Sequence, residues 1–195
     1  MRRLAVGDSC FLRPPTRSDG RELVALNRAS RSLHRALVSP PVTIAQYSAY
    51  LRKISDTQSA GLLVCRRSDE AIVGVVNFNQ IFLGPLKSAY IGYYAGEPYA
   101  GRGYLAEGVG LALRHAFRRL GLHRVEANIQ PENEPSRCVA ARNGFRLEGF
   151  SPRYLKIGGR WRDHERWAVL ADARPADPEH PAGRAPLERS RPGKV

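Results

Sequence analysis

Residues 99–107 read YAGRGYLAE, and this stretch is the most informative part of the sequence. It lies between an apolar segment at 89–94 that predicts a strand and a segment at 103–119 whose apolar residues recur at helical spacing. Glycines at such a junction let backbone N–H groups turn toward one anion, and the start of the helix adds a partial positive charge. The stretch therefore predicts a phosphate cradle, although glycines that merely turn the chain are the simpler alternative.

The sequence on both sides of this loop predicts a mixture of strands and helices. Apolar stretches at 61–67 and 71–79 flank a polar turn and predict a hairpin, and the helix at 103–119 predicts one crossover between parallel strands. This order predicts an α/β protein of the α+β kind, with a mixed, mostly antiparallel central sheet flanked by about four helices. The other expected elements are strands at 9–13, 123–130, 144–148 and onward, and 162–170, and helices at 19–28, at 43–54 after a Thr43 cap, and at 136–142.

The length of 195 residues fits one domain with a tail. Residues 1–170 are expected to form that domain, since their apolar residues are periodic throughout. From Ala171 onward the composition shifts to Asp, Ala, Arg, Pro, Gly and Glu, and the periodicity is lost. Residues 171–195 are therefore predicted to be a disordered tail.

The chain is strongly basic, with a formal net charge of +13. Such a charge favours polyanionic partners such as nucleic acid or the ribosome. Arginine is abundant together with alanine and glycine, however, which indicates a coding bias, and no basic helix with interleaved aromatic residues is present. A specific nucleic-acid ligand is therefore not expected, whereas a local basic site for a cofactor phosphate is.

Membrane, metal and disulfide chemistry are not expected. No apolar run approaches the roughly 20 residues that span a bilayer, and Asp8 interrupts the short apolar N-terminal stretch, so a cytoplasmic protein is predicted. Cys10, Cys65 and Cys138 lie far apart and form no CxxC pair, which argues against a metal site. Cys65 lies in an apolar run and is interpreted as a core residue.

The loop also satisfies a dinucleotide-binding pattern, G-x-G-x-x-A, through Gly101, Gly103 and Ala106. A nucleotide-linked oxidoreductase is therefore an alternative. In that motif the first glycine follows the strand almost directly, whereas residues 96–100 intervene here. The doubly wound fold also needs further strand–helix–strand units, and the sequence after the long helix does not predict them.

Four further stretches, taken in order, resemble the GNAT superfamily of N-acetyltransferases and within it the RimJ/RimL type, which acetylates the N-terminal amine of ribosomal proteins. The resemblance spans about residues 7–170. The family's phosphate motif, Q/R-x-x-G-x-G/A, falls on residues 100–105, where Gly103 keeps the central glycine while Ala100 and Leu105 depart from the pattern. The four stretches are IVGVVNF at 72–78, YIGY at 90–93, LHRVEAN through NEPS to NGFRLEG at 122–149, and YLKI through WRDH at 154–164.

The resemblance implies acetyl-coenzyme A as cosubstrate, without a metal. It implies that the strand at 89–94 separates from its neighbour and that the N–H of a residue near Tyr93 polarises the thioester carbonyl. Asn133 would bind the cofactor arm, and Ser136 would cap the short helix or protonate the departing thiolate. The pyrophosphate would be held by the backbone of Gly101, Arg102, Gly103, Tyr104, Leu105 and Ala106.

The resemblance also suggests how the amine loses its proton. Glu126 follows the long helix, where related enzymes often have a carboxylate, and it is the predicted base, acting through water. Asn128 lies on the same strand face by alternation and would orient that water. The alternative for Glu126 is an ion pair with Arg124. Asn77 is a candidate for substrate contact, with edge-strand hydrogen bonding as its alternative.

The acceptor is the least determined feature. The resemblance favours the N-terminal amine of a protein, by analogy a ribosomal one. A small amine such as an amino sugar, polyamine or antibiotic requires the same chemistry and remains open. A cofactor-binding regulator without catalysis is the alternative from another class, and homodimerisation is a further option.

Overall fold

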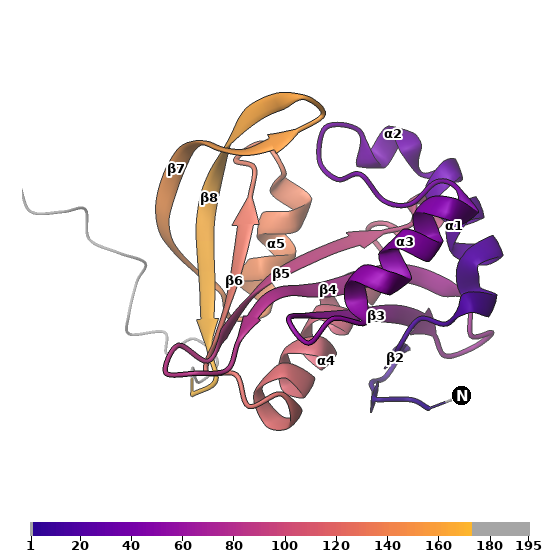
Figure 1. The fold of residues 1–195 in the computed structure, drawn as a ribbon, viewed down its shortest axis with the longest axis horizontal. Coiled ribbons are helices and arrows are strands. Elements are labelled where there is room, and N and C mark those ends of the chain that lie inside the picture. Colours follow the sequence, from indigo (N-terminus) through magenta and orange to yellow (C-terminus); the bar gives the residue numbers. More distant parts are fainter. Residues whose placement is uncertain (1, 173–195) are drawn as a thin grey trace, which may run out of the picture.

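A computed structural model describes residues 2–172 of the chain. These residues form an eight-stranded sheet in the order β1-β2-β3-β4-β5-β6-β8-β7, with helices on both faces (Figure 1). The strands are β1 (Ala5–Val6), β2 (Cys10–Arg13), β3 (Ser59–Arg66), β4 (Ile72–Phe82), β5 (Ser88–Ala95), β6 (Arg124–Ile129), β7 (Arg146–Ile157) and β8 (Arg160–Leu170).

The strand pairing confirms the predicted mixed, mostly antiparallel sheet. β5 and β6 are parallel, and the helix α4 (Tyr104–Arg119) connects them. The other neighbouring strands pair antiparallel, including the expected hairpin of β3 and β4. A single parallel pair beside antiparallel hairpins is not the doubly wound arrangement that the dinucleotide alternative requires.

Both faces of the central strands are buried, which explains their nearly continuous apolar sequence. In β3, Leu62 and Val64 pack with the core beneath α4, whereas Leu63 and Cys65 pack beneath α1 (Gly20–Ala29) and α3 (Ile44–Ile54). The side chains of a strand alternate between the two faces of the sheet, so one apolar run supplies both cores.

Two of the helices, α3 and α5 (Glu134–Arg142), begin at a residue whose side chain accepts one of their free N–H groups. The Thr43 side chain accepts the Gln46 N–H at 3.2 Å, which confirms the predicted cap of α3. The helix α5 begins two residues earlier than expected, because Asn133 is its capping residue. Residues 2–172 also contain the short helix α2 (Arg31–His34) and two 3-10 turns, η1 (Arg17–Asp19) and η2 (Glu97–Tyr99).

The final hairpin differs most from the prediction. β7 extends to Ile157, where Gly158 and Gly159 turn the chain with positive φ angles of 57° and 79°. Most of β7 is exposed because it is the edge strand, so its sequence lacks the apolar alternation that would have shown its full length. The expected tail falls, after its first two residues, outside the described part of the chain.

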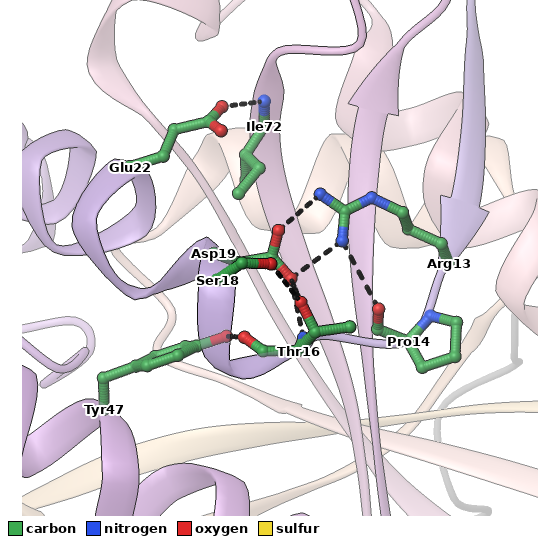
Figure 2. A network of polar contacts seen from close by, with 8 residues as sticks. All are labelled: Arg13, Pro14, Thr16, Ser18, Asp19, Glu22, Tyr47 and Ile72. Carbon is green, nitrogen blue, oxygen red and sulfur yellow. Dashed lines mark hydrogen bonds and ion pairs between the residues drawn. The ribbon is translucent and has the colours of Figure 1, made fainter. Parts of the chain in front are cut away.

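A buried ion pair fixes α1 and η1 to the sheet (Figure 2). Arg13 of β2 donates to both carboxylate oxygens of Asp19, at 2.9 and 2.7 Å. Asp19 also accepts the Thr16 N–H at 2.6 Å, and Tyr47 of α3 donates to the Thr16 carbonyl at 2.6 Å. One carboxylate therefore joins the strand, the turn before α1 and, through Thr16, the helix α3.

Candidate active site

The start of α4 is an open set of backbone donors. Gly101 and Gly103 have φ angles of 73° and 85°, which residues other than glycine rarely adopt. Gly103 caps the helix without a side chain, and no described residue accepts the N–H groups of Tyr104, Leu105 or Ala106. Consecutive free N–H groups at a helix start form an anion-binding site.

The acidic residue in the first turn of α4 is turned away from these donors. Glu107 accepts the Ser9 N–H at 3.0 Å and also binds the Ser9 hydroxyl. Burial alone would raise the pKa of Glu107, but the hydrogen bonds from Ser9 outweigh it and hold the pKa below its usual value. The carboxylate therefore anchors the N-terminal strands and does not occupy the anion site.

A wedge opens between β5 and β6. The two strands pair only from Ser88 to Tyr90, opposite residues 124–126, which confirms the expected separation. The Gly96 N–H donates to Val73 of β4, so the Ala95 carbonyl in the same peptide unit points away from β4. Because strand residues alternate in direction, the Tyr93 N–H also points away from β4 and toward the wedge.

Seven of the predicted cofactor residues line one cleft of about 460 Å³. The Arg102 side chain is exposed and does not line it, and Tyr104 packs edge-to-face on Tyr99 with ring centroids 6.4 Å apart. The cleft therefore joins the start of α4, the end of β5 and the start of α5. The seven residues are Tyr93, Gly101, Gly103, Leu105, Ala106, Asn133 and Ser136.

Asn133, rather than Ser136, is the residue that caps α5. The Asn133 side chain caps α5 by accepting the Ser136 N–H at 3.3 Å, so the prediction that Ser136 caps this helix is wrong. The Ser136 hydroxyl instead donates to the Tyr93 hydroxyl at 3.1 Å, and Tyr93 donates to the Ser136 carbonyl at 3.0 Å. Burial raises the pKa of Tyr93 to about 12, although the Ser136 hydrogen bond opposes this, so the phenol keeps its proton at neutral pH.

Comparison with known proteins identifies the fold. Residues 10–146 match the family model of the acetyltransferase (GNAT) domain. This chain belongs to the GNAT acetyltransferase family. It is 32% identical over 175 residues to a probable N-acetyltransferase, YjcK, of Bacillus subtilis (strain 168), covering 84% of this chain and 95% of that protein.

The chain is also similar to a ribosomal-protein acetyltransferase and to a solved structure of RimJ. The ribosomal protein uS5-alanine N-acetyltransferase of Escherichia coli (strain K12) is 38% identical over 96 residues, covering 49% of this chain and 50% of that enzyme. The structure of Mycobacterium smegmatis RimJ in complex with CoA-disulfide superposes with a TM-score of 0.78 at 28% identity, covering 86% of this chain and 84% of the other.

This GNAT protein is thus an acetyl-CoA-dependent N-acetyltransferase. The residues present fit the cosubstrate, because the start of α4 offers free N–H groups that suit a pyrophosphate and the wedge leaves the Tyr93 N–H for a carbonyl oxygen. Because the chain belongs to a family of enzymes, the alternative that it is a cofactor-binding regulator without catalysis is not retained. No helix within residues 2–172 is long and apolar enough to cross a membrane.

The predicted base does not line this GNAT cleft. Glu126 accepts a hydrogen bond from Arg124 Nε at 2.7 Å, and Arg124 also binds Glu148, so the alternative of an ion pair is realised. Glu126 and Asn128 do lie on the sheet face opposite α4, since Val125, Ala127 and Ile129 between and beyond them are buried in the core beneath α4. The Asn128 side-chain oxygen is buried without a described partner.

A second cleft, of about 770 Å³, adjoins the cofactor cleft. His34, Val38 and Tyr94 line both clefts. Asn77, the predicted substrate residue, lines the second one and accepts the Tyr50 hydroxyl at 2.7 Å. Its alternative was edge-strand hydrogen bonding, but β4 is an inner strand.

His34 is a site residue that the sequence did not indicate. Its side chain is 4% exposed, and Nε2 lies 2.8 Å from the Ala95 carbonyl oxygen. A carbonyl only accepts, so Nε2 carries the hydrogen and donates. The ring also contacts Tyr94 edge-to-face at 5.1 Å. His34 belongs to a four-residue helix in an Arg- and Ser-rich segment, where no periodicity or motif marks it.

The buried cysteines are unsuited to covalent catalysis. Burial, with a smaller effect of Glu107, raises the pKa of Cys10 to about 12, and burial raises that of Cys65 to about 11. Both thiols therefore stay protonated at neutral pH and are poor nucleophiles. Among residues 2–172, no three His, Cys, Asp or Glu side chains are grouped as a metal site requires.

Proposed function

We propose that this enzyme acetylates the N-terminal α-amino group of a protein. The observation that carries the proposal is the pair of clefts that meet at His34, Val38 and Tyr94, one beside the predicted pyrophosphate loop and one free for an acceptor. A volume of about 770 Å³ admits the first residues of a peptide. The similarity to enzymes named for ribosomal-protein alanine acetylation supports the same choice.

The reaction needs one N–C bond to form and the thioester C–S bond to break, while the amine loses a proton and the sulfur gains one. The Tyr93 N–H faces the wedge and would stabilise the negative charge on the carbonyl oxygen during attack. The Tyr93 and Ser136 hydroxyls, joined at 3.1 Å, form a protonated pair at the cofactor cleft that can supply the proton to sulfur.

For the proton of the amine we retain Glu126, acting through water. Its support is its position on the sheet face opposite α4, on the same strand face as Asn128. Its ion pair with Arg124 is exposed enough for water to reach, because the Glu126 side chain is 26% exposed. Glu126→Gln is expected to lower kcat with acetyl-CoA affinity kept. An unchanged kcat would assign the base elsewhere.

The acceptor is tested by turnover with matched substrates. Three acceptors are each incubated with acetyl-CoA: spermidine, an amino sugar, and a peptide that begins with alanine. Release of the coenzyme A thiol is followed, and the acetylated products are identified by mass spectrometry. Acetylation confined to the peptide α-amine supports the proposal. Faster turnover of either small amine would replace it with small-molecule acetylation.

A further inference from the structure

The charged side chains that line the second cleft all have the same sign. Arg31 of α2, Arg35 just after it and Lys53 of α3 line this cleft, and no carboxylate of the described residues does. All three side chains are exposed. None of them forms an ion pair with a described residue.

What makes this cluster distinct is its place, because three cations line one concave surface that no carboxylate of the described residues lines. Five arginines of residues 2–172, Arg13, Arg66 and Arg124 among them, have a carboxylate partner, and most of the arginines there do not. Three unpaired cations around a concave surface add to one positive potential, and low-dielectric walls focus that field into the cleft. The local charge therefore acts on whatever enters, in addition to the basic charge of the whole chain.

Hydrogen-bonding groups in the same cleft also favour a negatively charged ligand. The Asn77 side-chain oxygen accepts the Tyr50 hydroxyl, and the Gln46 side-chain oxygen accepts the Val42 N–H at 2.8 Å. Both amides thus use their oxygen within the protein and keep an NH₂ group for a ligand. The exception is Asn27, whose side-chain oxygen has no described partner and suits an amine N–H.

We propose that the second cleft selects acceptors with negative charge close to the acetylated amine, and that its occupant is a protein N-terminus followed by Asp or Glu residues. This inference rests on the proposed function, because it specifies the residues that follow the acetylated amine. Arg31, Arg35 and Lys53 attract those carboxylates. A polycation such as spermidine meets three like charges and no carboxylate, and this repulsion contributes to specificity as much as the attraction.

The test compares two peptides of equal length that both begin with alanine, one followed by Asp and Glu and the other by Lys and Arg. The acidic peptide is expected to have a kcat/KM about tenfold higher or more at low salt, mainly through KM, because the cations act on binding. The difference is expected to shrink at about 1 M salt, where the Debye length is about 3 Å.

Charge reversal assigns the effect to the cleft. Arg31→Glu, Arg35→Glu and Lys53→Glu are each expected to reduce the preference for the acidic peptide several-fold. Arg52→Glu is the matched control, since Arg52 precedes Lys53 on α3 and is exposed but does not line the cleft. An equal effect of Arg52→Glu would attribute the preference to net charge and overturn the role of the cleft.

The two proposals fail in different ways. If wild-type enzyme acetylates both peptides equally well, the charge selectivity is wrong while N-terminal acetylation stands. If it acetylates spermidine or an amino sugar and neither peptide, the proposed function itself is wrong.

Discussion

Gly103 has a φ of 85°, which favours glycine, and there is open space where a Cβ atom would lie. Gly103→Ala would strain the backbone by about 1–2 kcal/mol. Gly103→Glu adds a carboxylate at the loop expected to bind the pyrophosphate. We expect at least a tenfold loss of acetyl-CoA affinity for Gly103→Ala and a larger loss for Gly103→Glu, both measured by calorimetry.

Gly84→Ala serves as the control for this experiment, because Gly84 also has open space around it but lies in the turn between β4 and β5, away from the cleft. Acetyl-CoA affinity unchanged in Gly103→Glu would show that the loop does not bind the phosphates.

The Tyr93–Ser136 pair gives a second prediction at the scale of single residues. Tyr93→Phe removes the only phenolic proton in this pair, and kcat is expected to fall about 10²-fold or more with acetyl-CoA affinity kept. Ser136→Ala is expected to cost less, because Tyr93 still donates to the Ser136 carbonyl. Tyr154→Phe is the control, since Tyr154 lines neither cleft. Equal kcat in wild type and Tyr93→Phe would exclude the pair as the proton source.

The sequence predicted residues whose backbone or chemistry is unusual, and it missed those defined by tertiary contacts. Gly101 and Gly103 were found because positive φ favours glycine. His34 was not found, because its role depends on the Ala95 carbonyl, 61 residues away. The ion pair of Glu126 is predictable from the sequence, because Arg124 lies two residues away on the same strand face.

Secondary-structure elements were predicted well where apolar periodicity marks them. α4 and β3 were placed to within a few residues, because one buries a helical stripe and the other packs into both cores. The end of β7 was left open in the prediction because an exposed edge strand buries little and shows no apolar alternation. The start of α5 was misplaced because Asn133 and Ser136 are both good caps, and the sequence does not decide between them.

The attachment of α1 to β2 through Arg13 and Asp19 gives a prediction at the scale of elements. Both side chains are about 93% buried, and Asp19→Asn leaves the Arg13 charge without its partner (Figure 2). We expect a loss of about 3–5 kcal/mol in the free energy of unfolding, measured by denaturant titration. Asp69→Asn breaks an exposed pair with Arg66 and is expected to change this free energy little.

The same pair makes stability depend on acid. Burial would raise the pKa of Asp19, but hydrogen bonds from Arg13 and Thr16 outweigh it and lower the pKa below its usual value. As pH falls, the Asp19 carboxylate is therefore protonated in the unfolded state before it is protonated in the folded state. The contribution of Asp19 to the free energy of unfolding is fully present above the unfolded pKa of about 3.9, and it is lost as pH falls through the folded pKa. Asp19→Asn should flatten this acid slope. An unchanged slope would assign acid unfolding to other carboxylates.

At the scale of the whole molecule, tyrosines packed in both cores make the stability of the fold depend on alkaline pH. Burial raises the pKa of Tyr47 and of Tyr93 to about 12, and it raises those of Tyr50 and Tyr94 further. In the unfolded chain these phenols ionise near a pH of about 10. Above that pH the unfolded state releases protons that the folded state keeps, so stability is intact below about 10 and is lost as pH rises through 12.

Unfolding followed by circular dichroism should therefore coincide with the ionisation of these four phenols between these pH values, in one cooperative step. Because the chain has eight tyrosines, the absorbance of one phenol is obtained as the difference between wild type and its Phe variant. Tyr47→Phe removes one such phenol and is expected to make the alkaline slope shallower, although the hydrogen bond to the Thr16 carbonyl is lost as well. A difference in tyrosinate absorbance between wild type and Tyr47→Phe that develops near pH 10 while the fold persists would contradict the prediction. Such a result would mean that solvent reaches the Tyr47 phenol in the folded protein.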